Sequence, residues 1–133
     1  MNDLVSIIVP CYNGEKFVDR CFSSILKQDY ARIQIIAVND GSTDQSERRI
    51  LAWNDRFKNA GMRLVYIAQE NKGLGGAINS GLKAVSGEFL SLLDIDDEFL
   101  ETAVSSRVAF LNAHKDIDVV RSNGWYNRKS GNT

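Results

Sequence analysis

The chain has 133 residues, 44% of them hydrophobic, which suits one ordinary domain with a single core that needs no disulfide or metal staple. Its 16 Lys and Arg against 17 Asp and Glu leave a net charge of -1 without blocks of like charge, so the totals exclude a polyanion-binding surface for nucleic acid. No apolar run reaches the roughly 18 residues of a membrane span, and the N-terminus lacks the form of a signal peptide, so we expect a soluble chain.

Short apolar runs bounded by turn residues alternate along the chain with segments of helical period. Runs of this kind are typical of strands that are buried on both faces of a parallel sheet. We expect strands at Val5–Pro10, Ile33–Val38, Leu64–Ala68 and Phe89–Leu93, with a weaker one at Ile117–Val120. Apolar stripes predict helices near residues 17–26, 50–57, 76–85 and 100–111.

Signals at the ends of the expected helices support this division. The segment Ser42-Thr43-Asp44-Gln45 has capping-box spacing before the second helix, and Gly61 and Gly87 suit helix ends. The alternation predicts an α/β protein with an open, three-layer α/β/α, mostly parallel sheet in one domain over residues 1–133. Residues 122–133 are either a strand that enters a hairpin turn without a returning strand or a frayed end.

Cysteine and histidine add little to a predicted site. Cys11 and Cys21 lack metal-type spacing, and Cys21 falls on the apolar face of the first helix, which favours buried, reduced thiols and a cytoplasmic setting. His114 follows a helix end, so we expect it on the surface, far from the strand ends.

Polar residues gather where the expected strands end. The four segments are PCYNGE (10–15), NDGSTD (39–44), QENKGLGG (69–76) and DIDD (94–97). Because ligands of open α/β sheets bind beyond the carboxyl ends of the strands, we expect these segments to converge on one binding site.

The NDGSTD segment combines a turn with one candidate ligand. Asp-Gly makes a turn, and capping of the next helix is the favoured explanation of Ser42, Thr43 and Asp44. Asp40 precedes the turn, where its carboxylate can accept a hydrogen bond from a ring N–H of a base such as uracil. Tyr12 either lies against the same base or caps the core as a half-buried side chain.

The glycine-rich segment ENKGLGGAINSG matches neither familiar phosphate motif. A dinucleotide fingerprint would need a glycine where Ile78 stands, and a P-loop would need Gly-Lys-Ser or Gly-Lys-Thr. The glycines at 73–76 still permit a phosphate at a helix N-terminus, with Lys72 as a mobile counter-charge. The alternative is a tight loop that packs helix against strand.

The acidic run DIDD places like charges side by side at the end of the fourth strand. On an extended segment Asp94 and Asp96 project to one side while Ile95 turns into the core. Two hard oxygen ligands attract Mg²⁺ or Mn²⁺, which keeps positions open for diphosphate oxygens. Helix capping competes with this interpretation, and we assign capping to Asp97 and the ligand role to Asp96.

Taken together, these motifs resemble those of the family 2 glycosyltransferases. The segments VSIIVPCYNGEKFVDRCFSSILKQ, VNDGSTD and NKGLGGAINSGLKAVSGEFLSLLDIDD follow the family's order and spacing, within a match from Val5 to about Tyr126. The resemblance implies a GT-A fold that binds a nucleotide-diphospho-sugar, with a UDP-sugar expected, and transfers the sugar with inversion. The implied acceptor is a hydroxyl of a glycan or a lipid-linked molecule.

The resemblance also implies roles for individual residues. Asp40 would bind the base, Pro10 and Tyr12 would shape its slot, and Asp94 would lie near the ribose and diphosphate. Glu15 matches an acidic position in the family's first loop, without a firm contact. The expected donor-binding residues are Pro10, Tyr12, Glu15, Asp40, Lys72 and Asp94, and the expected metal ligands are Asp94 and Asp96.

In the family the general base is an Asp beyond the fourth-strand motif, so we expect this chain to be the N-terminal, donor-binding part of a longer domain. The implied process is polysaccharide or cell-envelope glycan synthesis, with the full-length protein in the cytoplasm or at the cytoplasmic membrane face. One rival is a nucleotide-sugar-binding module without transfer activity. Another is a nucleotidyltransferase, against which PCYNGE counts because it has one glycine and no arginine.

Overall fold

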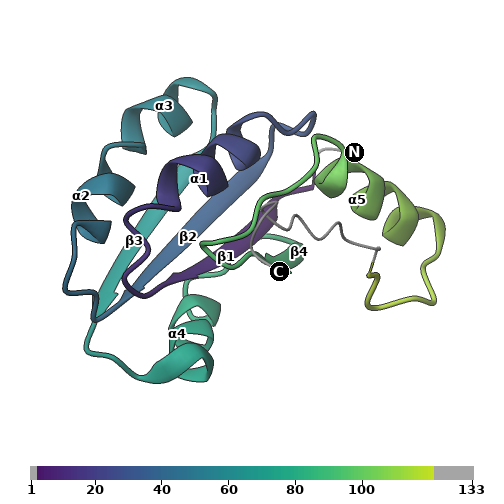
Figure 1. The fold of residues 1–133 in the computed structure, drawn as a ribbon. Coiled ribbons are helices and arrows are strands. Elements are labelled where there is room, and N and C mark those ends of the chain that lie inside the picture. The colour runs from purple at the N-terminus through teal and green to yellow at the C-terminus, as the bar shows by residue number, and fades with distance from the viewer. Residues whose placement is uncertain (1–2, 122–133) are drawn as a thin grey trace, which may run out of the picture.

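A computed structural model describes residues 3–121 (Figure 1). Its strands are β1 (Val5–Cys11), β2 (Ile33–Asp40), β3 (Arg63–Gln69) and β4 (Phe89–Leu92), and its helices are α1 (Val18–Leu26), α2 (Ser46–Leu51), α3 (Asn54–Asn59), α4 (Gly73–Leu82) and α5 (Ala103–Ala113). The strands lie in the order β3-β2-β1-β4, and each neighbouring pair is parallel.

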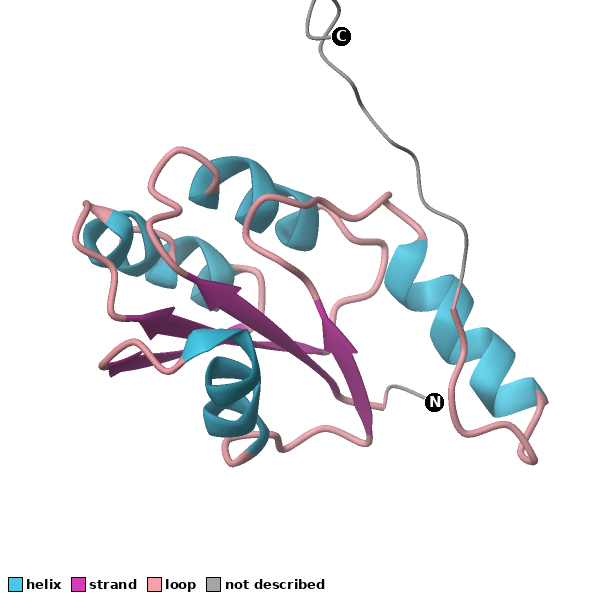
Figure 2. Cartoon of the chain, turned by 60° about the horizontal axis from the view of Figure 1, so that its bottom comes forward, coloured by secondary structure: helices cyan, strands magenta, loops and turns pink. Residues whose placement is uncertain are grey.

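Helices cover both faces of the sheet, which confirms the expected three-layer α/β/α architecture. Helices α1, α2 and α3 lie on one face and α4 lies on the other, while α5 flanks the side of β4 (Figures 1 and 2). The larger apolar cluster, which includes Ile7, Phe22 and Phe57, fills the first interface. A smaller cluster that includes Ile8 and Ala77 fills the interface with α4.

The central strands carry the core, as their sequences predict. Every residue of β1 and β2 is buried, and both strands are rich in the β-branched side chains that suit a two-sided sheet. Pairing of β1 with β4 ends at Ile8 and Leu92, so the last residues of β1 have no strand on that side. Because Ile8 accepts a hydrogen bond from Leu93, Pro10 turns its nitrogen to the same open side, where no N–H is needed.

The edge strands correct the expectation of burial on both faces. Leu90 and Leu92 are 47% and 50% exposed, although the sequence predicts a dry interior for them. Leu90 pairs with Ser6 of β1 and Leu92 pairs with Ile8. Because Ile8 packs against α4, these leucines lie on the face of the sheet that α4 covers. Helix α4 packs on β1 and β2 and does not fully cover β4, so about half of each leucine stays accessible at the sheet edge.

The second predicted helix is two short helices. Helix α2 ends at Leu51, which is exposed, and α3 begins at Asn54. Trp53 lies at the break and packs its ring against Phe22 and Phe57, with ring centroids 6.1 and 5.7 Å away. The expectation of one continuous stripe is therefore wrong, because the chain bends to bring the indole into the core.

Other element boundaries also differ from the prediction. Gly61 follows α3 with φ of 78°, as expected of a helix end. Gly87 does not end a helix, since α4 stops at Leu82; a Cβ on Gly87 would lie 2.5 Å from the Leu4 carbonyl oxygen, so close packing explains this glycine. Residues 117–120 form no strand, and the predicted tail at 122–133 lies outside the described residues.

None of the helices within residues 3–121 combines the length and the apolar character that crossing a membrane would require.

Candidate functional site

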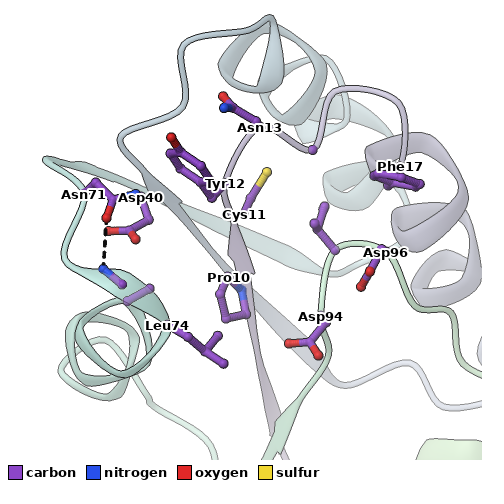
Figure 3. Close-up of a pocket in the computed structure, with 14 residues that line it drawn as sticks. Pro10, Cys11, Tyr12, Asn13, Phe17, Asp40, Asn71, Leu74, Asp94 and Asp96 are labelled. Atoms are coloured by element: carbon purple, nitrogen blue, oxygen red, sulfur yellow. Dashed lines mark hydrogen bonds between the residues drawn. The ribbon is translucent and has the colours of Figure 1, made fainter.

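The predicted convergence of the four polar segments is confirmed. A pocket of about 380 Å³ lies at the carboxyl ends of β1 and β2, between the first turn of α4 and the turn that follows β4 (Figure 3). Each of the four segments contributes to its wall. The volume falls in the range of roughly 300–1,000 Å³ that is typical of small-molecule sites.

Asp40 forms the wall at the end of β2. Its side chain is only 4% exposed, and its Oδ1 accepts hydrogen bonds from Gln69 Nε2 at 2.9 Å and from the backbone N–H of Lys72 at 2.8 Å. Within residues 3–121, Oδ2 of Asp40 has no hydrogen-bonding partner. One carboxylate oxygen is therefore anchored by the protein and the other can accept a donor from a ligand.

Pro10 and Tyr12 line the same pocket from the end of β1 (Figure 3). The Tyr12 side chain is 54% exposed and belongs to neither apolar cluster, so it does not cap the core. An exposed aromatic face at a pocket rim can stack on a planar ring. Between the two possibilities left open by the sequence, the structure places Tyr12 at the rim.

The acidic run forms a turn and not the extended segment that the sequence predicts. The N–H of Asp97 donates to the Asp94 carbonyl at 2.9 Å, while Ile95 is buried in the larger apolar cluster as expected. The turn brings carboxylate oxygens of Asp94, Asp96 and Asp97 within 4.8 Å of one another. Asp94 and Asp96 line the pocket, opposite Asp40 (Figure 3).

Asp97 belongs to this acidic turn, and its predicted role as a helix cap is wrong. Helix α5 begins at Ala103, and the N–H of Val104 donates to Gln28 Oε1. Partial desolvation of its carboxyl group and the neighbouring Asp96 and Asp94 charges raise the pKa of Asp97 above its ordinary value. All three carboxylates are exposed, which makes them hard oxygen donors accessible to a cation.

Glu15 and the Lys72 side chain stand outside the pocket wall. Glu15 Oε2 accepts a hydrogen bond from the N–H of Gln45 at 3.1 Å, and the Glu15 N–H donates to Asp44. Lys72 contributes its backbone N–H, which anchors Asp40, while its side chain is exposed. Both residues therefore adjoin the pocket without lining it.

Asn13 is a loop residue that sequence reasoning missed. Its N–H donates to Ser42 Oγ at 2.9 Å, and its Oδ1 accepts the N–H of Thr43 at 2.8 Å. These contacts tie the loop after β1 to the loop after β2. Ser42 and Thr43 do not cap the next helix, so the predicted capping explanation is wrong for them. The Asn13-Gly14 pair in the sequence indicates only a turn, and in the structure Asn13 has a left-handed backbone with φ of 49°.

Asp44 retains part of the predicted capping role. Its Oδ1 accepts the N–H of Ser46, the first residue of α2, at 2.9 Å, while Oδ2 accepts the N–H of Glu15 at 3.1 Å. Burial acts to raise the pKa of Asp44, but the hydrogen bonds from Ser46 and Glu15 outweigh it and hold the pKa below its ordinary value.

The contact between the β2 tip and the α4 loop depends on one glycine. A Cβ on Gly41 would lie 2.6 Å from the Asn71 backbone nitrogen, and Gly41 has φ of 76°. Asn71 lines the pocket and accepts the N–H of Gly73 at 3.2 Å (Figure 3). The sequence indicated only a turn at Gly41, since no local pattern reveals a contact 30 residues away.

The two cysteines are free and buried, as predicted. Burial raises the pKa of both thiols above the ordinary value, so both are neutral near pH 7. Cys11 lines the pocket, and Cys21 lies on α1 behind the acidic turn. His114 stacks on Phe110 at the end of α5, away from the pocket wall, as its sequence position indicates.

Comparison with known proteins decides the family. The model of glycosyl transferase family 2 matches residues 6–133. The chain belongs to this family. An uncharacterized glycosyltransferase of Rickettsia prowazekii is 37% identical over 117 residues, which cover 88% of this chain and 35% of the relative.

Solved structures agree with this membership. The structure of S. aureus TarS residues 1–349 in complex with UDP is 30% identical, with a TM-score of 0.76, and the match covers 84% of this family 2 chain and 33% of that solved chain. Mannosyltransferase PcManGT of Pyrobaculum calidifontis, in complex with GDP-Man and Mn2+, has a TM-score of 0.74 over 84% of this chain and 33% of its own; at 24% identity it is a likeness of fold alone. The expected GT-A fold is thus confirmed, and the match spans about a third of the Rickettsia relative and of each of these solved chains.

Proposed function

We propose that this chain binds the nucleotide-diphospho-sugar donor of an inverting glycosyltransferase, with a UDP-sugar as donor and Mn²⁺ or Mg²⁺ as cofactor. The observation that carries the proposal is a single pocket with two different acidic walls. Asp40 is buried and anchored on one wall, and the acidic turn is exposed on the other. Support also comes from S. aureus TarS, whose structures contain UDP and UDP-GlcNAc.

The wall at Asp40 is proposed to bind the base. Uracil carries a ring N–H, and Oδ2 of Asp40, which has no partner among residues 3–121, is an acceptor of matching chemistry. Tyr12 offers an exposed ring for stacking, and Pro10 closes the slot with an apolar, rigid surface. Together these groups would select a planar ring with a hydrogen-bond donor.

The acidic turn is proposed to hold the cation. Its donor set fits Mn²⁺ or Mg²⁺, because the carboxylates are hard ligands, lie within 4.8 Å of one another and are open to the pocket side. Asp94 and Asp96 would be the ligands, with Asp94 also near the ribose and diphosphate. When bound, the metal would stabilise the negative charge that develops on the leaving diphosphate.

Other parts of the site would act around these two walls. Lys72 is exposed at the start of α4, where its side chain would serve as a mobile counter-charge to the diphosphate. Glu15 would hold the loop after β1 in place through Gln45, beside the donor. We assign no general base among residues 3–121.

The wider proposal places this chain as a donor-binding domain over residues 1–133. The acceptor would be a hydroxyl of a glycan or a lipid-linked molecule, in polysaccharide or cell-envelope glycan synthesis. The free, buried thiols support a reducing cytoplasmic location. Association of the whole protein with the cytoplasmic membrane face is part of the same proposal.

Calorimetric titration with UDP tests the core of this proposal. We expect UDP to bind in Mn²⁺ and to bind at least about tenfold more weakly in EDTA, because the cation links two anionic partners. The Asp55→Asn variant is the control, since Asp55 is an acidic residue in the first turn of α3, outside the pocket wall. Equal affinity with and without EDTA would contradict the metal role, and no UDP binding in either buffer would contradict the donor role.

A further inference from the structure

The acidic turn has no side-chain contacts that orient its carboxylates. Within residues 3–121, no hydrogen bond or ion pair reaches the carboxylate oxygens of Asp94, Asp96 or Asp97. Their relative positions therefore depend on the backbone of the segment 93–102, which is neither helix nor strand. What holds this backbone determines where the carboxylates stand.

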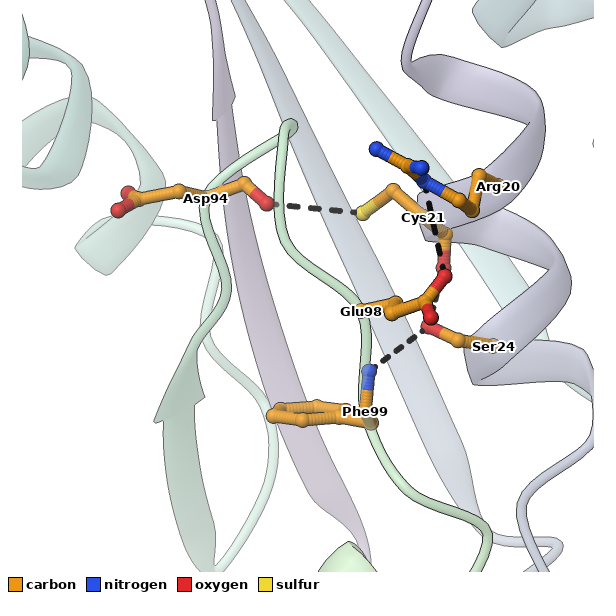
Figure 4. Close-up of polar contacts among 6 residues, drawn as sticks. All are labelled: Arg20, Cys21, Ser24, Asp94, Glu98 and Phe99. Carbon is orange, nitrogen blue, oxygen red and sulfur yellow. Dashed lines mark hydrogen bonds and ion pairs between the residues drawn. The ribbon is translucent and has the colours of Figure 1, made fainter. Parts of the chain in front are cut away.

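One face of α1 holds the segment at the start of the turn and beyond its end (Figure 4). At the first residue of the turn, Cys21 Sγ donates to the Asp94 carbonyl at 3.8 Å. After it, the N–H of Phe99 donates to Ser24 Oγ at 3.0 Å. Residues 21 and 24 are three apart, so one helical turn brackets the acidic residues.

Gln28 continues this face beyond the end of α1 and holds the rest of the segment. Its amide is 8% exposed, and it uses both polar atoms: Nε2 donates to the Leu100 carbonyl at 2.7 Å and Oε1 accepts the N–H of Val104 at 3.1 Å. A buried amide satisfied in both directions fixes its partners, because loss of either bond leaves an unpaired polar group.

An ion pair between α1 and this segment is weaker. Arg20 and Glu98 form an ion pair at 3.6 Å with both side chains more than half exposed, so water screens it (Figure 4). Backbone groups of the segment are thus satisfied mainly by neutral side chains of the helix. Neutral partners hold the backbone without adding a charge that would compete with the carboxylates for a cation.

We propose that Cys21, Ser24 and Gln28 are positioning residues that set the geometry of the acidic turn and thereby its affinity for a divalent cation. The inference rests on the proposed metal role of Asp94 and Asp96. It assigns this part of the chain a function besides core packing: α1 carries Phe22 and Ile25 into the core, while Cys21 and Ser24 on α1, and Gln28 just beyond its end, hold the acidic segment.

The test is Mn²⁺ binding to the Ser24→Ala variant, measured in the presence of saturating UDP from the loss of the free Mn²⁺ signal in electron paramagnetic resonance. Removal of Oγ leaves the N–H of Phe99 without its partner, so the turn should loosen. We expect Mn²⁺ affinity to fall about tenfold, as for other residues that orient metal ligands, while UDP binding in EDTA stays unchanged.

Two serines of α1 supply a matched comparison. Ser23→Ala is the control, because Ser23 is the adjacent residue and its side chain makes no hydrogen bond within residues 3–121. Ser24→Thr restores a hydroxyl and should bind Mn²⁺ within about twofold of the parent protein. Gln28→Ala is a second variant that should also weaken Mn²⁺ binding, compared at a temperature where circular dichroism shows every variant folded.

The possible outcomes separate this inference from the proposed function. If Ser24→Ala lowers the melting temperature but leaves Mn²⁺ affinity equal to that of Ser23→Ala, the residue is only structural and the positioning role is wrong. If the parent protein fails to bind Mn²⁺ with UDP, the metal role itself is wrong. Weaker Mn²⁺ binding in Ser24→Ala with recovery in Ser24→Thr supports the inference.

Discussion

The two acidic walls of the pocket use the same side-chain chemistry in opposite ways. Asp40 is buried, and two N–H groups of the protein donate to one of its oxygens. The carboxylates of the acidic turn are exposed and close together, and within residues 3–121 no N–H group donates to them. The first wall has one anchored carboxylate oxygen and one free acceptor, whereas the second has clustered negative charge without N–H donors among the described residues.

This difference indicates what each wall is suited to bind. A buried carboxylate whose charge is stabilised by N–H donors presents a fixed acceptor, which suits a neutral group with one N–H. Clustered, exposed carboxylates repel one another until a cation joins them. Substitutions on the two walls should therefore change different measurements.

The largest effect is expected from Asp96→Asn. Loss of a charged metal ligand should lower Mn²⁺ affinity in the presence of UDP by about 100-fold. Substitution of residues that only orient a metal ligand already costs up to about that factor. Stability without metal should stay equal or rise by a few tenths, about 0.3 kcal/mol, because a like-charge neighbour is removed. Manganese titration and thermal melts check both parts. A marked loss of stability with normal Mn²⁺ binding would show that Asp96 stabilises the fold and does not bind the cation.

Asp40→Asn should show the opposite pattern. The anchored oxygen can still accept from Gln69 and Lys72, but the amide NH₂ replaces the free acceptor that faces the pocket. We expect UDP binding to weaken about tenfold and the free energy of unfolding to fall by about 1–2 kcal/mol, since a charge-assisted bond becomes neutral.

Calorimetry with and without Mn²⁺ checks whether the two walls act separately. The factor by which Mn²⁺ strengthens UDP binding should be the same in Asp40→Asn as in the parent protein, and it should disappear in Asp96→Asn. A changed factor in Asp40→Asn would mean that the walls are coupled more closely than their separate contacts indicate.

A pair of glycines tests how far the Asp40 wall depends on close packing. Gly41 and Gly61 have almost equal φ angles of 76° and 78°, but only Gly41 has a backbone neighbour that a Cβ would strike. Gly61→Ala should cost about 1–2 kcal/mol from the left-handed backbone. Gly41→Ala should cost at least about 1 kcal/mol more, from displacement of Asn71.

Chemical denaturation of both glycine variants, with UDP binding measured beside it, checks this prediction. Only Gly41→Ala should weaken UDP binding, because Gly41 adjoins Asp40 and Asn71. Equal stability losses in the two variants would show that the α4 loop yields easily, and the Asp40 wall would then be less rigid than its hydrogen bonds indicate.

The smallest effect is expected from Asp44, which ties the loops behind the Asp40 wall. Its folded-state pKa is below the ordinary value, so its stabilising contribution is complete above the unfolded pKa of about 3.9 and is lost as the pH falls through the lower folded pKa. Asp44→Asn should therefore reduce the melting temperature at neutral pH, and the difference from the parent protein should shrink as the pH falls below about 4. Equal melting temperatures at neutral pH would contradict a role for this carboxylate.

The sequence predicted the parts of the fold that depend on local periodicity. β1 and β2 are continuous apolar runs, and α1 carries an apolar stripe with helical period. These elements form as expected because each pattern is complete within its own segment. The split between α2 and α3 was not predictable in the same way. It depends on Trp53 reaching Phe22, which belongs to another helix.

The candidate site shows the same division. That the strand ends would meet followed from the rule for parallel sheets, and Asp40 and the acidic residues stand at the pocket as predicted. The positions of Asn13 and Asn71 could not be predicted, because their partners lie about 30 residues away in sequence. Asp97 was misassigned since an acidic residue ahead of a helix is typical of a cap, while Gln28 already supplies that contact.

By itself the sequence determined the α/β alternation, the membership of glycosyl transferase family 2 and the identity of the acidic residues at the strand ends. Only the tertiary structure decided that Asp40 is anchored, that Asp97 joins the acidic turn and that α1 holds this turn in place. The physical reason is range: apolar periodicity is written along neighbouring residues, whereas the hydrogen bonds that orient a carboxylate come from whichever segments the folded sheet brings beside it.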